Sequence, residues 1–386
     1  MPPGAIHREG VLLGLKVAIV CSWLNQYGGA ERVLAAVHEM YPEAPIYTSI
    51  FWPKALPPAF QKWDVRPSFL NRLPWIHRHH QWFLPLYPYA FDQLDLSGYD
   101  LVLSVSSAFA HGVVTGPKTL HVCYCLTPAR FLWDYPHYVA REGLNRLARL
   151  VIPLFVYNLR LWDRVAADRV DHFLAISGAV QQRIQKFYHC SAEVIYPPVD
   201  VERFSPSSER GDYYLIASRL VPYKRIDLAV KAFNQLGLPL WVVGDGRDRR
   251  ALESMAASNV RFLGRVSDVE LERHLSGCRA FVFPGEEDFG IAPLEAQAAG
   301  RPVIAYAGGG ALETVREGQT GLLFREPTPE SLAETVRRFE NIRFDPLAIR
   351  EHAQRFSRAV FQQKLADFVR QKYDQHAAGV GAGSGS

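Results

Sequence analysis

Short apolar runs alternate along the chain with stretches of helical periodicity. The first run, "LKVAIVCSWL" (15–24), is nearly continuous, as expected of a strand buried on both faces of a parallel sheet. Two glycines follow it and lead into a helical pattern with Val33, Leu34 and Val37 on one face. Further strands are predicted at 100–107, 120–127 and 172–177, with a helix at about 144–167.

A change of composition divides this pattern in two. The segment "VIYPPVDVERFSPSSERGD" (194–212) is rich in Pro, Ser and charged residues, which indicates a linker. After it, strands and helices of about ten residues alternate again as far as "GLLF" (321–324). This alternation predicts an α/β protein with two doubly wound domains facing each other across a cleft. The predicted parts are a first domain at 14–205, a second at 206–356, a helix crossing back at 357–375, and a flexible tail at 376–386.

Composition and charge narrow the class of protein. With 48% hydrophobic and 21% charged residues, the 386-residue chain is typical of a soluble globular protein. A net charge of +4 is too small to indicate nucleic acid, but it suits an anionic small substrate or an anionic membrane surface.

The cysteines and the apolar stretches indicate the cellular compartment of the protein. The five cysteines form no CxxC pair, which favours reduced thiols in the cytoplasm. The most apolar stretch, 150–162, is too short to span a membrane and is interrupted by Pro153 and Arg160. We therefore expect a cytoplasmic protein.

An acidic cluster follows one predicted strand directly. In "FPGEEDFGIAPLEAQAAG" (283–300), Glu286, Glu287 and Asp288 come immediately after apolar sequence. Carboxylates beside a core are costly unless they are paired, solvated or used. Ligands of open α/β sheets bind at the carboxyl ends of strands, so this cluster is predicted to meet the hydroxyl groups of a ligand.

Several motifs in order resemble one family of enzymes. They are "GGAERVL", "SRLVPYKRIDLAV", "VVGDGRDRRALE", "FLGRVSDVELERHL", the Glu-x7-Glu element of Glu287 and Glu295, and "GGALETVREGQTGLLF". Their order and spacing over residues 16–368 are similar to those of the retaining glycosyltransferases of family 4, which have the two-domain GT-B fold. The chain looks most like the mannosyltransferase-type enzymes of bacterial O-antigen and exopolysaccharide assembly. The resemblance implies that a hexose, with GDP-mannose as the expected donor, is transferred to a glycan or lipid-linked saccharide.

Arg219 and Lys224 are the first candidates for catalysis. Negative charge develops on the diphosphate as the glycosidic bond breaks, and two fixed cations stabilise that charge. The resemblance gives this role to Arg219 and Lys224, which follow the first strand of the second domain. The alternative is a solvated basic turn.

The resemblance also implies the donor contacts. Gly28 and Gly29 close over the donor, although a plain tight turn is the alternative reading. Glu287 contacts the transferred sugar and Glu295 the ribose, because a carboxylate accepts hydrogen bonds from two hydroxyls. Glu286 is read as an exposed or locally paired acid next to the motif. The remaining predicted donor contacts are Arg265, Val266, Asp288, Phe289, Gly290 and Ile291.

Two positions depart from the family pattern. Asp288 stands where relatives usually have glycine, and Leu126 where many have a histidine that holds the donor sugar. No catalytic histidine is therefore assigned, and His111 and His121 are read as ordinary polar histidines. The predicted residues of the acceptor side are Arg130, Trp133 and Asp134.

The segment 62–91 mixes basic and aromatic residues. Such a segment is able to lie on anionic lipid with its tryptophans at the headgroup level, and packing into the core is an equal alternative. No Asp-x-Asp pair occurs in the chain, so no metal-bridged diphosphate and no metal or other cofactor is expected.

Two rival functions remain open. A sugar-nucleotide 2-epimerase shares the fold but needs acid and base groups, and an acceptor-dependent reaction distinguishes the two. An inactive sugar-nucleotide-binding subunit draws support from Leu126. A dinucleotide dehydrogenase is disfavoured because no GxGxxG follows either first strand.

Overall fold

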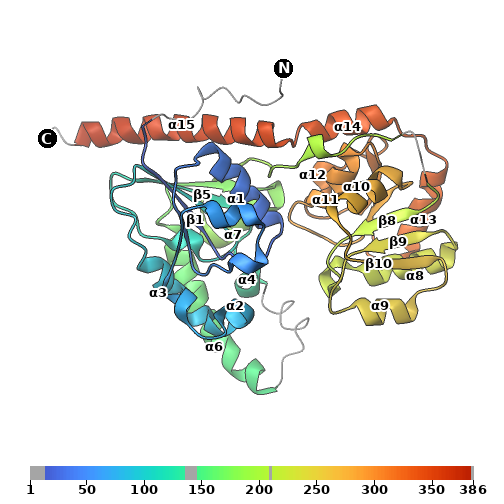
Figure 1. Ribbon diagram of the computed structural model, residues 1–386, viewed down its shortest axis with the longest axis horizontal. Helices are drawn as coiled ribbons and strands as arrows, with labels where there is room; N and C mark the ends of the chain where they lie inside the picture. The colour runs from blue at the N-terminus through green and yellow to red at the C-terminus, as the bar shows by residue number, and fades with distance from the viewer. Residues whose placement is uncertain (1–13, 135–145, 208–210, 384–386) are drawn as a thin grey trace. The chain divides into compact units, whose positions relative to one another are not determined.

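The computed structural model describes residues 14–134, 146–207 and 211–383 (Figure 1). The chain divides into two compact units: unit 1 comprises Met1–Pro198 with Phe361–Ser386, and unit 2 comprises Val199–Val360. The sequence had placed the boundary after residue 205, several residues later. It had also placed a flexible tail at 376–386, whereas helix α15 (Arg358–Gly383) continues through most of that stretch.

Unit 1 contains a parallel sheet of seven strands within the described residues, in the order β3-β2-β1-β4-β5-β6-β7. The order reverses between β1 and β4, so these neighbours form the switch point of a doubly wound sheet. The sequence missed β2, β3 and β7, which have only three residues each and therefore leave no clear apolar run. The strands are β1 (Val17–Cys21), β2 (Ile46–Thr48), β3 (Val65–Pro67), β4 (Leu101–Ser106), β5 (Leu120–Cys125), β6 (His172–Ala175) and β7 (Ala192–Val194).

Helices cover both faces of this sheet. One face carries a cluster that joins Ala18, Val20 and Val102 of the sheet to Tyr87 and Leu159 of the helices. On the other face α15 packs through Phe361 against Tyr124 of β5, and Gln362 donates to the carbonyl of Ala36 in α1 at 3.0 Å. The α-helices are α1 (Gly29–Met40), α2 (Ile76–His79), α3 (Tyr87–Asp92), α4 (Arg130–Trp133), α6 (Arg146–Ala167) and α7 (Gly178–Tyr188), and the short 3-10 helices include η5 (His80–Leu86) and η6 (Ala110–Gly112).

Unit 2 contains a second parallel sheet, of six strands within the described residues, in the order β10-β9-β8-β11-β12-β13. Its switch point lies between β8 and β11. The strands are β8 (Tyr214–Ala217), β9 (Leu240–Val243), β10 (Val260–Gly264), β11 (Phe281–Phe283), β12 (Val303–Tyr306) and β13 (Gly321–Phe324). The α-helices are α8 (Ile226–Leu236), α9 (Arg249–Met255), α10 (Asp268–Gly277), α11 (Ile291–Ala298), α12 (Ala311–Thr314), α13 (Pro329–Glu340) and α14 (Pro346–Gln354).

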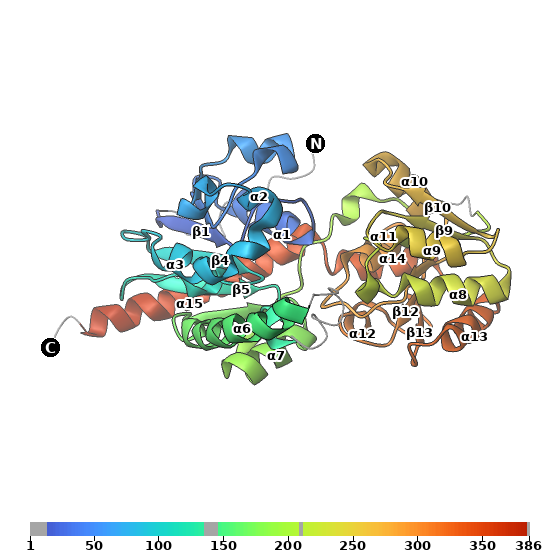
Figure 2. The same ribbon diagram turned by 90° about the horizontal axis from the view of Figure 1, so that it is seen from below.

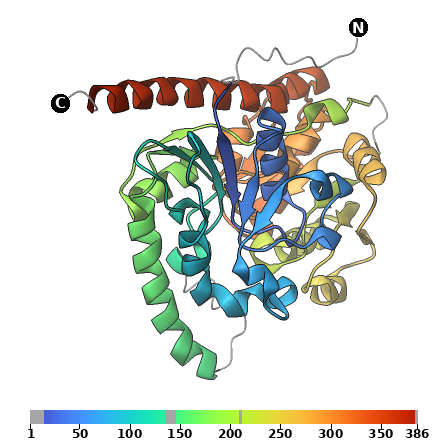
Figure 3. The same ribbon diagram turned by 60° about the vertical axis from the view of Figure 1, so that its left-hand side comes forward.

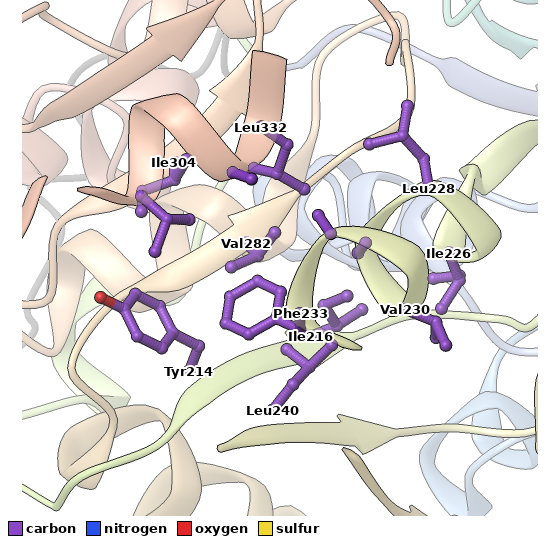
Figure 4. Packing of buried hydrophobic residues seen from close by; sticks show 14 of the residues in the cluster. Tyr214, Ile216, Ile226, Leu228, Val230, Phe233, Leu240, Val282, Ile304 and Leu332 are labelled. Carbon is purple, nitrogen blue, oxygen red and sulfur yellow. The ribbon is translucent and has the colours of Figure 1, made fainter. Parts of the chain in front are cut away.

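One hydrophobic core of unit 2 lies between a face of its sheet and α8, α9 and α13. Phe233 of α8 is fully buried, and Figure 4 shows it among the side chains of Tyr214, Ile216 and Val282 from the sheet. Its ring meets that of Tyr214 edge-on at 5.0 Å. This packing fixes the sheet whose carboxyl edge carries the predicted donor residues.

None of the helices in the described part of the chain has the length and apolarity needed to cross a bilayer. All five cysteines are free; Cys190 is partly buried and the other four are buried.

Candidate functional site

Glycines bring three loops of unit 2 into backbone contact at the switch point. A Cβ on Gly285 would lie 2.8 Å from the carbonyl oxygen of Tyr223 and 2.9 Å from the Cα of Lys224, so only glycine allows this approach. The loop after β12 joins them, because the N–H of Gly310 donates to the carbonyl of Glu287 at 2.9 Å. The loops that follow β8, β11 and β12 therefore form one continuous edge.

Lys224 and Glu287 form an ion pair across this switch point. Their side chains are 13% and 23% exposed, so the pair is largely removed from water. The sequence analysis predicted that Lys224 meets the diphosphate and Glu287 the transferred sugar. Nothing in the sequence indicated that the two side chains touch each other. Breaking the pair would leave a partly buried charge without its partner, which is costly.

Arg219 lies on the same loop as Lys224 and is exposed. Its guanidinium donates one hydrogen bond, to the hydroxyl of Tyr223 at 2.9 Å. A guanidinium has five N–H donors, so others remain for a ligand. The predicted pair of cations is thus present at one strand end, with Lys224 held by a carboxylate and Arg219 facing solvent.

The acidic segment is divided between solvent and the helix that follows. Glu286 is exposed and Asp288 is half-buried, whereas Glu295 on α11 is buried. Helix α11 starts after Gly290, whose φ of 88° favours glycine. The N–H groups of the first helical turn have no partner within the helix and favour an anion. The ring of Phe289 is buried, so only its backbone is available to a ligand.

The predicted contacts Arg265 and Val266 follow β10 on the same edge of the sheet. Arg265 is exposed and Val266 is half-buried. Strand β9 separates β10 from β8, so these two residues lie two strands away from Arg219 and Lys224.

A small cavity of about 20 Å³ lies at the switch point of unit 1. Leu126, the departure from the family pattern, forms part of its wall after β5. The sequence analysis did not single out the other lining residues. Glu31 is the one that could have been found, because it carries a carboxylate close to the glycines of "GGAERVL". The cavity is lined by Cys21, Ser22, Trp23, Leu24, Ala30, Glu31, Leu34, Val105, Ser107 and Leu126.

Gly28 and Gly29 stand at the start of α1. Gly28 has a φ of −163°, which any residue adopts, and a Cβ there would find its nearest atom at 3.5 Å. Neither its backbone conformation nor its packing therefore requires glycine at Gly28. The preceding loop is anchored by a hydrogen bond between the side-chain amide of Asn25 and Nδ1 of His80, at 3.0 Å.

Helix α4 carries the predicted acceptor-side residues Arg130 and Trp133, and Asp134 follows it directly. The structure gives Trp133 an anchoring contact. Its indole N–H donates to Asp163 Oδ2 at 2.7 Å, and its ring stacks on Phe187 at 4.7 Å. Asp134 is exposed and Arg130 is half-exposed at the same end of the sheet. Trp133 therefore holds α4 against α6 and α7.

Asp163 was missed by the sequence, because nothing in its neighbourhood marks it as buried. It is fully buried, and it accepts a hydrogen bond from Tyr188 at 2.9 Å besides that of Trp133. His111 Nε2 lies 3.5 Å from its other oxygen. Burial raises the pKa of the Asp163 carboxyl.

His121 is also fully buried in unit 1, where its Nε2 meets the hydroxyl of Ser104 at 2.9 Å. Burial lowers the pKa of His121 to about 3, so the ring is neutral. Among the described residues, no three His, Cys, Asp or Glu side chains gather as a group able to hold a metal ion.

The tryptophans of the basic and aromatic segment 62–91 differ in their burial. Trp63 packs on Phe60 and His38, as a core residue would. Trp75 and Trp82 are 72% and 69% exposed. Part of the segment is therefore core and part is surface.

Two Rossmann-like units, each with its switch point at β1/β4 or β8/β11, define the GT-B class of glycosyltransferase folds. Two family models match the chain: "Glycosyltransferase Family 4" at residues 27–203 and "Glycosyl transferases group 1" at residues 200–362. The chain belongs to the glycosyltransferases of family 4.

Similar curated proteins carry mannosyltransferase names. A "GDP-mannose-dependent monoacylated alpha-(1-6)-phosphatidylinositol monomannoside mannosyltransferase" of Corynebacterium glutamicum is 32% identical, over 45% of this chain and 54% of its own length. A "GDP-mannose-dependent alpha-(1-6)-phosphatidylinositol monomannoside mannosyltransferase" of Mycobacterium tuberculosis is 30% identical, over 54% of this chain and 63% of its own length. The chain thus spans between half and two thirds of the length of these relatives.

Solved structures share the fold over nearly the whole chain. WaaG, described as a glycosyltransferase involved in lipopolysaccharide biosynthesis, superposes with a TM-score of 0.65 at 18% identity, over 91% of this chain and 99% of its own.

Proposed function

We propose that this protein is a retaining hexosyltransferase that moves mannose from GDP-mannose to a hydroxyl of a glycan or lipid-linked saccharide. The observation that carries the proposal is the Lys224–Glu287 ion pair at the switch point of unit 2, beside Arg219 and the first turn of α11. The names of both mannosyltransferase relatives support the donor and a lipid-borne acceptor.

In this proposal the cations act on the leaving diphosphate. As the bond between C1 of the sugar and the phosphate oxygen breaks, charge grows on the diphosphate, and Arg219 and Lys224 stabilise it. Glu287 orients Lys224 and accepts hydrogen bonds from the sugar, while Glu295 holds the ribose. The acceptor oxygen attacks C1 from the face that the diphosphate leaves, and a phosphate oxygen takes its proton.

Unit 1 carries further residues of the proposal. Neither the packing nor the backbone conformation requires glycine at Gly28. A residue without a side chain at this position supports close approach of a ligand to the start of α1. Arg130 on α4 and Asp134 directly after it are proposed to contact the acceptor. The residues proposed to contact the donor are Asp288, Gly290, Ile291, Arg265 and Val266.

Nucleotide binding is the first test. In a thermal-shift panel of GDP-mannose and UDP-, ADP- and dTDP-sugars, we expect GDP-mannose to raise the Tm most, because a ligand that binds only the folded state stabilises it. Glu295→Gln should reduce that shift, since the ribose loses a carboxylate acceptor, whereas Glu286→Gln, at an exposed neighbouring acid, should retain it. A shift unchanged in Glu295→Gln would remove Glu295 from the site.

Turnover separates this proposal from its rivals. A transferase consumes the donor only when an acceptor is present, a 2-epimerase converts the donor alone, and an inactive subunit does neither. Incubating GDP-mannose with and without a bacterial glycolipid extract therefore decides among the three.

Activity should survive chelation. The chain has no Asp-x-Asp pair, and the diphosphate charge is proposed to rest on Arg219 and Lys224 instead. We expect equal rates with and without EDTA after extensive dialysis. Loss of turnover with EDTA and its return on adding Mg²⁺ would contradict a mechanism without metal.

We also propose a cytoplasmic protein held peripherally on the inner face of the membrane, where a lipid-linked acceptor is presented. The exposed Trp75 and Trp82 and the basic character of segment 62–91 support this location.

A further inference from the structure

Large hydrophobic side chains gather on the surface of unit 1 in two segments. One is the aromatic segment, residues 69–89, and the other is helix α6. Single exposed apolar side chains are ordinary, but a cluster of them marks an interaction surface. The exposed members are Phe69, Trp75, Trp82, Leu86 and Tyr89 in the aromatic segment, and Phe155, Tyr157, Leu161 and Val165 in α6.

Helix α6 is apolar on both of its faces. Tyr157, Leu161 and Val165 follow one another at intervals of four residues and are 61%, 51% and 61% exposed, so they form one stripe toward solvent. On the opposite face Val156 and Leu159 are buried in the core of unit 1. A helix that is apolar all round is normally covered, and no described part of the chain covers this stripe.

The two segments belong to the same layer of unit 1. Val156 and Leu159 of α6 share a hydrophobic cluster with Ile76 and Tyr87 of the aromatic segment. Helices α3 and α6 both contact η6. In Figure 1, α2, α3 and α6 lie below the strands of this unit, and Figures 2 and 3 show the same unit from below and after a turn to the side. Their exposed apolar side chains therefore lie on one side of unit 1.

Charge indicates what covers this side. Residues 69–91 contain no Asp or Glu, and the exposed Arg72 and Arg78 form no ion pair with another described residue. Helix α6 contains four arginines, and its one acid, Asp163, is buried. Of these arginines, Arg160 donates to the carbonyl of Leu132 and Arg164 pairs with the exposed Asp168 just after the helix, so Arg72 and Arg78 carry the charge argument. Basic residues interleaved with exposed Trp and Tyr suit an anionic lipid surface, where the rings sit at the headgroup level and the arginines meet phosphates.

We propose that the α6 stripe (Tyr157, Leu161, Val165) and the aromatic segment together form one docking surface on which unit 1 rests against an anionic bilayer, with α6 lying in the plane of the interface. The inference rests on the proposed function in one respect, because a lipid-linked acceptor gives the docking its purpose. It extends that proposal to α6, whose 22 residues include four arginines and are not apolar enough to span a membrane.

Cosedimentation of the full chain with vesicles tests the proposal. We expect binding to phosphatidylcholine vesicles that contain phosphatidylglycerol, little binding to phosphatidylcholine alone, and weakening with salt. Leu161→Ser with Val165→Ser should weaken binding about ten-fold or more, since apolar area leaves the interface. Arg72→Gln with Arg78→Gln should cost about five-fold per arginine.

The matched control is Val269→Ser with Leu347→Ser, which removes side chains that are 61% and 70% exposed on unit 2. This control should bind as the unchanged protein does. Melting curves establish that each variant folds, and Tyr157→Ser is a milder alternative if the double variant in α6 does not.

Several results would overturn the inference. They are no binding to anionic vesicles, binding that ignores lipid charge, or equal losses in the α6 and control variants. Light scattering that shows a dimer split by Leu161→Ser with Val165→Ser would instead make a second copy the occupant. Sedimentation needs neither donor nor turnover, so docking and the proposed transferase activity fail independently.

Discussion

Arg219→Ala and Lys224→Ala should each lower kcat by about a hundred- to a thousand-fold, the usual effect of removing one donor from a site of developing charge. Both cations face charge that grows as the glycosidic bond breaks, so their contact is stronger in the transition state than with the bound donor. A smaller rise in the donor Kd should accompany the loss, because the bound diphosphate is already charged. The measurement is kcat at saturating donor, with Kd by calorimetry.

The structure makes the two variants unequal. Lys224→Ala also leaves Glu287 without its partner in a largely buried position, so it should lower the Tm as well. Arg219 is exposed and bonded only to Tyr223 among the described contacts, so its variant should melt normally. Arg219→Lys should restore only part of the rate, because a point charge does not replace the planar fork of a guanidinium.

Lys231→Ala, at an exposed lysine on α8 of the same unit, is the matched control and should leave kcat unchanged. If Kd rises about a hundred-fold in Arg219→Ala and Lys224→Ala while kcat is kept, these residues only hold the donor. The stabilisation of the leaving group would then belong elsewhere, for instance to the first turn of α11.

Gly285→Ala should lower kcat about a hundred-fold although no side chain of the site is changed. The added methyl would lie 2.8 Å from the carbonyl oxygen of Tyr223 and 2.9 Å from the Cα of Lys224, so one of the two loops must move. A displacement of about 1 Å at a positioned catalytic group costs on the order of 10²-fold in rate. Overpacking of this kind also costs about 1–3 kcal/mol of stability.

Gly116→Ala is the control, because a Cβ there meets nothing closer than 3.9 Å. It should leave both kcat and Tm unchanged. Full activity in Gly285→Ala, with a normal Tm, would show that the loop of Lys224 accommodates the methyl and that its position against Glu287 is not critical. Because Gly285→Ala is also expected to lower the Tm, rates are compared only at temperatures well below the Tm of the variant.

Local patterns were sufficient for the long elements and for the place of the candidate site. The apolar runs at β1, β4 and β5 are continuous, and strands of this kind are covered on both faces in the interior of a doubly wound sheet. Arg219 and Glu287 come directly after predicted strands, and parallel strands bring their carboxyl ends to one edge. Strands β2, β3 and β7 were missed, since three residues are too few to establish a period.

The tertiary structure alone decided which residues meet. Lys224 and Glu287 are far apart in sequence, and their ion pair exists because β8 and β11 are neighbours at the switch point and because Gly285 lets the two loops touch. The burial of Asp163 and the exposure of the α6 stripe are likewise absent from the pattern. The sequence determines how apolar each position is, but which face of a helix is covered depends on segments that arrive from elsewhere in the chain.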